Sequence, residues 1–87
     1  MKRSMYAIRD LKAGTFNAPV IMDNDAVATR SFGDLVCDRQ KGTLISTHPA
    51  DFALCRVGEF DIEKGVLIPA DGGFVQLAVG SDFFKGE

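Results

Sequence analysis

The sequence predicts an α+β domain, with a small sheet of four to five mainly antiparallel strands and one main helix packed on one face. Short β-prone segments are separated by glycine-containing turns, as is typical of antiparallel sheets. Only one segment, about residues 24–38, has apolar residues at helical spacing. Since 87 residues suffice for one domain at most, we expect a single domain over residues 1–87.

The N-terminal part predicts two strands joined by a turn. Residues 5–12 form the first, because Tyr6 and Ile8 are apolar and β-prone. Residues 13–15 contain a glycine and predict the turn, and residues 16–22 predict the second strand. Pro19 has no N–H to donate, which favours a sheet edge or a bulge at this position.

The predicted helix starts at Asn24 and Asp25, whose side chains accept hydrogen bonds from free amides at a helix N-terminus. Gly33 inside it costs up to about 1 kcal/mol relative to alanine, so we expect a close helix–sheet contact there. The helix ends at about residue 37 or 38, and one apolar stripe faces the core: Ala28, Phe32, Leu35 and Val36.

The rest of the chain predicts three further strands. Residues 38–46 are polar and predict an exposed loop, and Pro49 suits the first position of a short helical turn. The expected strands cover residues 53–60, 66–69 and 74–79, with turns at 62–65 and 71–73, and a last helical turn holds Phe83 and Phe84.

The last strand predicts self-association. Residues 74–79 are apolar on both faces, and a strand buried on both faces needs two covers. One helix covers one face only. We therefore expect a homodimer in which a second copy covers the other face, or the tail at Phe83 and Phe84.

The charge balance excludes a strongly basic DNA-coating protein, because the net charge is −2. The distribution is uneven: residues 1–48 hold seven basic and five acidic groups, and residues 49–87 hold three basic and seven acidic groups. This split fits a basic and an acidic face, and it also fits an ordinary mixed surface.

No targeting signal is expected. Met1, Lys2 and Arg3 are followed by no apolar run long enough for a signal peptide or a membrane span. Cys37 and Cys55 fit buried free thiols in a reducing compartment. These features predict a cytosolic protein.

No catalytic or metal-binding constellation is visible, so we expect a non-enzymatic protein without a cofactor. His48 is the single histidine and lacks a partner at ligand spacing. Cys37 and Cys55 form no CxxC motif and have no base placed beside them in sequence. The paired glycines at 72–73 lack the residues of a phosphate loop.

A basic set predicts the candidate site. Basic groups bind a phosphate backbone, and an aromatic ring stacks bases of a single strand. Such a set also occurs on ordinary surfaces, and Arg30 is equally suited to an ion pair with Asp10 or Asp34. The residues that we assign to nucleic-acid binding are Arg3, Tyr6, Arg9, Lys12 and Arg30.

An ordered series of residues resembles the small nonstructural protein of microviruses, particularly of gokushovirus-type single-stranded DNA phages. The resemblance covers roughly residues 5–80. In the first half it rests on Tyr6-Ala7-Ile8-Arg9-Asp10, Lys12, Gly14, Phe16, Pro19, Asn24-Asp25, Ala28, Arg30 and Phe32. In the second half it rests on His48-Pro49-Ala50-Asp51-Phe52, Leu54, Gly58-Glu59-Phe60-Asp61 and Lys64-Gly65.

The resemblance implies a replication-stage protein of the host cytoplasm that is absent from the virion. It implies a counterpart of the C protein of related phages, which helps to switch synthesis from double-stranded replicative DNA to single-stranded genomes. We therefore expect binding to single-stranded DNA, to the phage replication initiator protein, or to both. The alternative is a protein–protein adaptor that docks a host or phage protein through its acidic half or its Phe83–Phe84 tail, without DNA contact.

Overall fold

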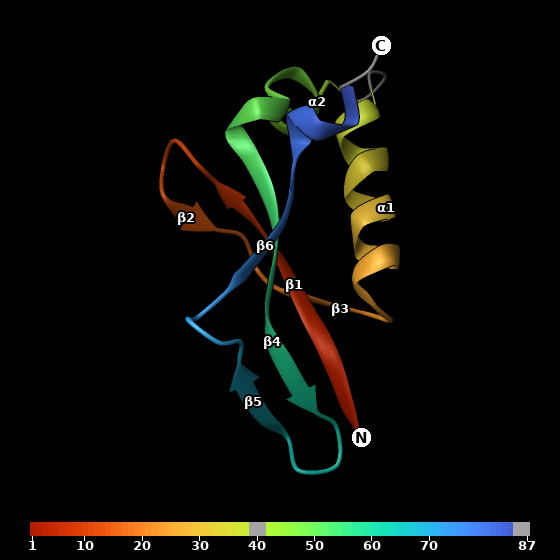
Figure 1. Ribbon diagram of the computed structural model, residues 1–87, viewed down its shortest axis with the longest axis vertical. Helices are drawn as coiled ribbons and strands as arrows, with labels where there is room; N and C mark the ends of the chain where they lie inside the picture. Colours follow the sequence, from red (N-terminus) through yellow and green to blue (C-terminus); the bar gives the residue numbers. More distant parts are fainter. Residues whose placement is uncertain (39–41, 85–87) are drawn as a thin grey trace.

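The computed structural model describes residues 1–38 and 42–84. Two long antiparallel strands form its centre, β1 (Lys2–Asp10) and β4 (Phe52–Asp61). Both strands run along the length of the molecule (Figure 1). The molecule measures 43 × 24 × 24 Å. The predicted α+β class, with an antiparallel sheet and one main helix on it, is confirmed.

Four short strands share the two outer positions of the sheet. β2 (Thr15–Phe16) and β3 (Val20–Met22) both pair with β1, and β5 (Val66–Pro69) and β6 (Val75–Val79) both pair with β4. The strand predicted over residues 16–22 is thus two strands. They are separated at Asn17, whose Oδ1 accepts a hydrogen bond of 2.7 Å from the Ile8 amide, and at Pro19, which donates none.

Helix α1 (Asp25–Cys37) starts where the sequence predicts. Asn24 is its N-cap, and its Oδ1 accepts a hydrogen bond of 2.9 Å from the Val27 amide. The expected loop over residues 38–46 becomes helical at its end, because α2 (Leu44–Thr47) begins there; residues 39–41 lie outside the described part. The short 3-10 helices η1 (Pro49–Asp51) and η2 (Gly80–Phe84) lie at the same end of the molecule as α2 (Figure 1).

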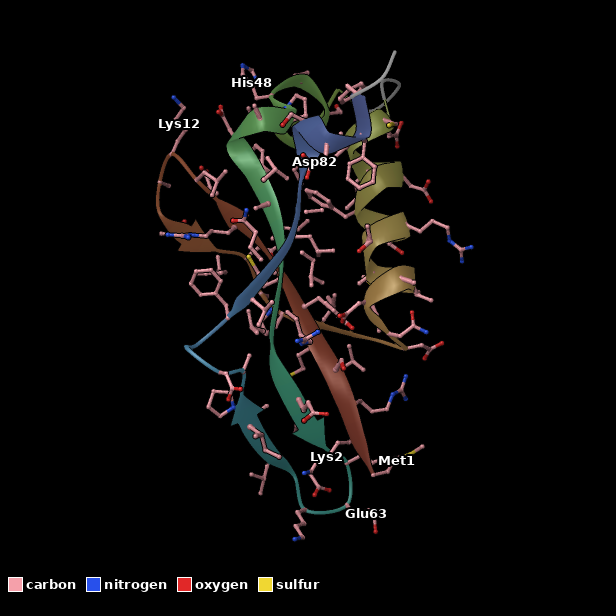
Figure 2. All side chains as sticks on the ribbon, in the orientation of Figure 1. Met1, Lys2, Lys12, His48, Glu63 and Asp82 are labelled. Atoms are coloured by element: carbon pink, nitrogen blue, oxygen red, sulfur yellow. The ribbon has the colours of Figure 1, made fainter. Side chains whose placement is uncertain are left out.

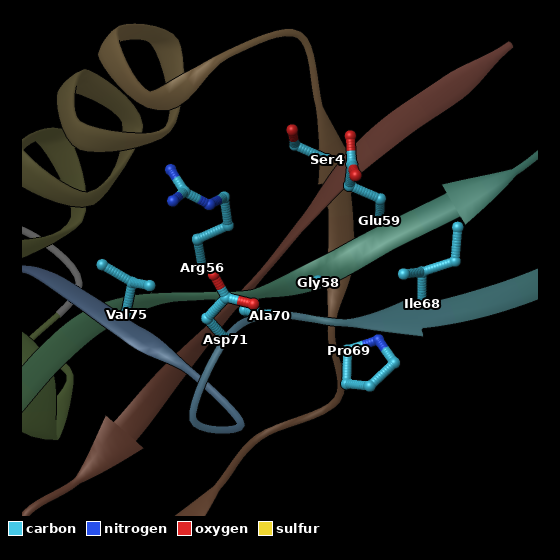
Figure 3. A pocket seen from close by; sticks show the side chains of 9 residues that line it. All are labelled: Ser4, Arg56, Gly58, Glu59, Ile68, Pro69, Ala70, Asp71 and Val75. Carbon is cyan, nitrogen blue, oxygen red and sulfur yellow. The ribbon is translucent and has the colours of Figure 1, made fainter.

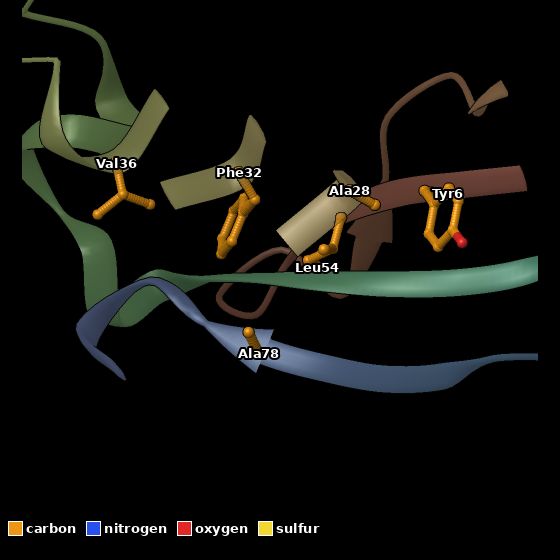
Figure 4. Packing of buried hydrophobic residues seen from close by; sticks show 6 residues of the cluster. All are labelled: Tyr6, Ala28, Phe32, Val36, Leu54 and Ala78. Atoms are coloured by element: carbon orange, nitrogen blue, oxygen red, sulfur yellow. The ribbon is translucent and has the colours of Figure 1, made fainter. Parts of the chain in front are cut away.

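The core lies between α1 and the sheet (Figure 4). Its buried residues come from the helix and from three strands: Ala28, Phe32, Val36, Tyr6, Leu54 and Ala78. Leu35, which the helical stripe predicts as buried, is 40% exposed. The stripe that packs on the core is therefore narrower than predicted.

Helix η2 covers part of α1. The rings of Phe32 and Phe83 make an edge-to-face contact with centroids 5.8 Å apart. A Cβ added at Gly33 would lie 2.6 Å from Cε1 of Phe83. The close contact expected at this glycine is thus made with Phe83 and not with the sheet, and the chain's own helix covers the Phe83 ring.

Candidate functional site

The sheet face opposite α1 has a small core of its own. Ala7, Ala53 and Cys55 are buried there, since they alternate along β1 and β4 with residues that face the helix. Their cover comes from Phe16 and Phe74, whose ring centroids are 5.2 Å apart. Phe16 lies on β2 and Phe74 just before β6, on opposite edges of the sheet. The sheet must therefore curl, so that this face is concave.

Arg9 lies beside both rings, which also contact each other. It pairs with Phe16 across β1 and β2. Its guanidinium carbon is 5.5 Å from the centroid of Phe16 and 5.0 Å from that of Phe74. Both distances are within the range of cation–π attraction. We call the set of Arg9, Phe16 and Phe74 the aromatic clamp.

The charge of Arg9 has no carboxylate within ion-pair distance in the described part of the chain. Its Nε is buried and has no hydrogen-bond partner among the described residues. Phe16 is 40% exposed, so the clamp reaches solvent. The clamp thus combines a fixed cation that no carboxylate of the described residues neutralises with two aromatic rings, an arrangement that suits an anionic ligand with flat groups.

Three of the other predicted site residues, Arg3, Tyr6 and Arg30, do not lie beside Arg9. Arg3 forms an ion pair of 2.8 Å with Asp23. The Tyr6 ring is fully buried in the core on the opposite side of the sheet, so it offers no surface to a base. Lys12 is exposed in the turn after β1 (Figure 2), and Arg30 is exposed on α1. Neither alternative partner of Arg30, Asp10 or Asp34, forms an ion pair with it.

A second polar cluster anchors the start of α1 to the sheet. The Tyr6 hydroxyl donates a hydrogen bond of 2.7 Å to Asp25, and Arg56 donates one of 2.5 Å to the other carboxylate oxygen. The hydrogen bond from Tyr6, aided by Arg56, holds the pKa of Asp25 below its ordinary value. Burial, followed by the bond to Asp25, raises the pKa of the Tyr6 hydroxyl. Tyr6 and Asp25 therefore serve the fold.

This cluster predicts how stability depends on pH. Because the folded pKa of Asp25 is depressed, its contribution is present above the unfolded pKa of about 3.9 and is lost as pH falls below it. We expect Asp25→Asn to lower the free energy of unfolding at pH 7 by roughly 1 kcal/mol, since the Asp25 side chain is 46% exposed and its ion pair is partly screened.

Urea unfolding between pH 2.5 and 7 measures this effect. The variant should lose less stability than the wild type when the pH falls from 5 to 3. Asp71→Asn, at an exposed turn position, is the matched control and should keep the wild-type profile. An unchanged acid profile in Asp25→Asn would contradict the assignment.

A polar concavity of about 470 Å³ lies where β5 ends and β6 begins. Figure 3 shows Ser4, Arg56 and Glu59 extending from the sheet on the side of α1. Arg56 is already paired with Asp25, whereas Glu59 and Asp71 add negative charge to the lining. The negative charge of this lining repels an anionic ligand. The concavity is therefore not a continuation of the ligand site at the aromatic clamp.

The remaining candidates make no site in the described residues. His48 is exposed, and its Nδ1 lies 2.9 Å from the Thr47 hydroxyl. Cys55 is a buried free thiol as predicted, and burial raises its pKa; Cys37 is exposed, which corrects the prediction for it. No three side chains of His, Cys, Asp or Glu converge in residues 1–38 and 42–84. Within the same ranges, no helix has the length and apolar character needed to cross a bilayer.

Comparison with known proteins identifies the family. The model of the phage ORF5 protein family matches residues 3–83. The chain belongs to this family. It is 32% identical over 81 residues to the protein ORF5 of Chlamydia phage 1, which covers 91% of this chain and 84% of that protein. No solved structure matches the chain.

The comparison confirms the predicted relation to gokushovirus-type microvirus proteins. The matched residues include Arg9, Phe16 and Phe74, so the clamp lies inside the ORF5 region. Sequence reasoning included Arg9 but missed the role of the two phenylalanines. Phe16 was detectable, because a tight turn after β1 brings it beside Arg9. Phe74 was not, since its contact depends on the curl of the sheet.

Proposed function

We propose that this ORF5-family protein is a non-enzymatic, nonstructural phage protein that acts in viral DNA replication in the host cytoplasm and is absent from the virion. It binds single-stranded DNA, the replication initiator, or both, in the switch to single-stranded genome synthesis, as the counterpart of the C protein. The observation that carries the DNA contact is the aromatic clamp.

The chemistry of the clamp matches single-stranded DNA better than duplex DNA. Unpaired bases are free to stack on the exposed part of Phe16 and on Phe74, while the guanidinium of Arg9 contacts a phosphate. In a duplex the bases are stacked on each other and unavailable. Occupancy of the exposed strand near the origin would then block a further round of double-strand synthesis.

Fluorescence anisotropy of a labelled single-stranded oligonucleotide and of its duplex tests this proposal, at low and at physiological salt. We expect micromolar or tighter binding that prefers the single strand and weakens with salt, because each phosphate contact releases counterions. Equal binding to both forms would contradict the stacking model. Absence of binding to either form at low salt would contradict direct DNA contact.

A second candidate is the protein–protein adaptor without DNA contact. It is favoured by the dispersal of the basic residues: Arg3 is neutralised by Asp23, and Arg30 lies on α1, on the other side of the sheet from the clamp. The net charge of −2 also limits phosphate binding. If no DNA binds, a pull-down with purified replication initiator becomes the deciding measurement, and its retention would favour the adaptor.

We also propose that the protein is a homodimer. The support is the outer edge of β5, where Val66 and Leu67 are 47% and 65% exposed and form an apolar strand edge. Sedimentation equilibrium at micromolar concentration should give twice the chain mass of 9.4 kDa. Leu67→Lys should shift the mass to that of one chain, and a monomeric wild type would contradict the proposal.

A further inference from the structure

An apolar groove of about 230 Å³ lies between α1 and the segment that contains β3, on the helix side of the sheet. Ile8 and Leu54 form its floor, Phe32 and Leu35 the helix wall, and Val20 and Met22 the opposite wall. An apolar cavity of about 150 Å³ is enough to hold a benzene molecule. The groove therefore has room for at least one aliphatic or aromatic side chain.

The strand beside this groove has a free edge. β3 pairs with β1 along one edge only, and no strand of the described chain pairs with the other. Val20 is 50% exposed and Ile21 is 46% exposed. A free edge next to an apolar groove is the arrangement in which a bound peptide adds a strand and places alternate side chains into pockets.

The charge along the helix wall indicates the chemistry of the occupant. Ser31 and Leu35 line the groove, and Asp34 and Asp38 follow Ser31 and Leu35 at a spacing of three residues, so they lie on the same side of the helix. Asp34 is exposed and has no ion pair among the described residues. Arg30 lies on the same side four residues before Asp34, so the rim is acidic only toward the C-terminal end of α1. That end of the rim favours a segment with basic residues beside its apolar ones.

A second copy pairing through its own β3 does not fit this charge. The chain around its β3 has no lysine or arginine between residues 13 and 29, so it offers no cation to the acidic rim. We propose that the groove binds an extended segment of a partner protein, with apolar side chains at alternate positions and flanking lysine or arginine, as an added strand on β3. This proposal does not rest on the DNA site, because the aromatic clamp lies on the other face of the sheet.

A library of random twelve-residue peptides displayed on phage, panned against the whole folded protein, tests this inference. Enriched peptides should have apolar residues at alternate positions with flanking basic residues. Synthetic peptides of those sequences should bind the wild type and should lose at least tenfold in affinity with Ser31→Phe, which fills the groove, and with Leu35→Lys. Leu44→Lys, the same change at a residue 68% exposed on α2, should bind like the wild type.

Charge reversal tests the acidic rim separately. Asp34→Lys should weaken the same peptides several-fold, whereas Asp71→Lys, with the same change in net charge at the β5–β6 turn, should not. No enrichment, enrichment without the alternation, or binding that is indifferent to Ser31→Phe would overturn the proposal. Conversion of a dimer to a monomer by Ser31→Phe would overturn it too, because a second copy would then be the occupant.

The variants must stay folded for these outcomes to count. Circular dichroism and oligonucleotide binding provide that control, since the clamp is remote from the groove. A variant that loses the peptide but keeps oligonucleotide binding supports the groove. If the wild type binds the peptides but no oligonucleotide, this result contradicts only the proposed DNA contact.

Discussion

Gly58→Ala is expected to lower the free energy of unfolding by about 3 kcal/mol or more. Gly58 has φ = +156°, in the region that side chains rarely adopt. A Cβ there would lie 2.2 Å from the carbonyl oxygen of Ile68 and 3.1 Å from Cα of Pro69. Both are backbone atoms of β5, which runs beside Gly58 (Figure 3), so no side-chain rotation relieves the clash.

The place of Gly58 in the sheet explains why this residue must be glycine. Gly58 pairs with Met5 of β1 and with Pro69 of β5, next to the bulge between Met5 and Tyr6. A domain of this size has a total stability of roughly 5–10 kcal/mol. The substitution thus removes a large part of it and separates β5 from β4.

Gly65→Ala is the matched control, because Gly65 has φ = +67° but a Cβ there would meet nothing within 4 Å. Its cost is that of the left-handed conformation alone, about 1 kcal/mol. Urea unfolding followed by far-ultraviolet circular dichroism compares the two variants. If both variants lost the same free energy of unfolding, the backbone at Ile68 would be moving away from the new Cβ. That result would contradict the expected clash.

The predictable part of the fold is the part set by local sequence. Asn24 as helix cap, the turn before Val66 and the strand over residues 66–69 were correct. The division of the second strand was not predicted, because it depends on the hydrogen bond between Asn17 and the Ile8 amide across the turn. The exposure of Leu35 was not predicted, because helical periodicity gives the direction of a side chain and not whether other residues cover it.

The candidate site was less predictable than the fold, because its contacts join residues far apart in sequence. Asp25 was interpreted as a helix-start residue; in the structure it also accepts hydrogen bonds from Tyr6 and from Arg56, 31 residues later. The Tyr6 ring lies in the core because Tyr6 faces the helix side of β1. Arg9 points the other way because it is three residues further along the same strand, and the curl of the sheet brings Phe74 to it.

Arg9→Met is expected to reduce the affinity for single-stranded DNA by about tenfold to a hundredfold while the protein stays folded. Methionine keeps an unbranched apolar stem beside Phe16 and Phe74, so the rings retain their contact surface. The cost in stability is the lost cation–π attraction, about 1 kcal/mol. The lost charge removes one phosphate contact, so the slope of log affinity against log salt should fall by about 0.7.

The salt slope separates charge from stacking in the clamp. Phe74→Leu keeps the charge of Arg9 but removes one aromatic surface, so it should lower affinity at every salt concentration and leave the slope unchanged. Arg30→Met, the same chemical change as Arg9→Met on the exposed side of α1, should leave affinity within about twofold if only the clamp contacts the strand. If Arg30→Met matched Arg9→Met in affinity and slope, binding would be diffuse electrostatic attraction. The clamp would then be a structural contact that closes the second face of the sheet.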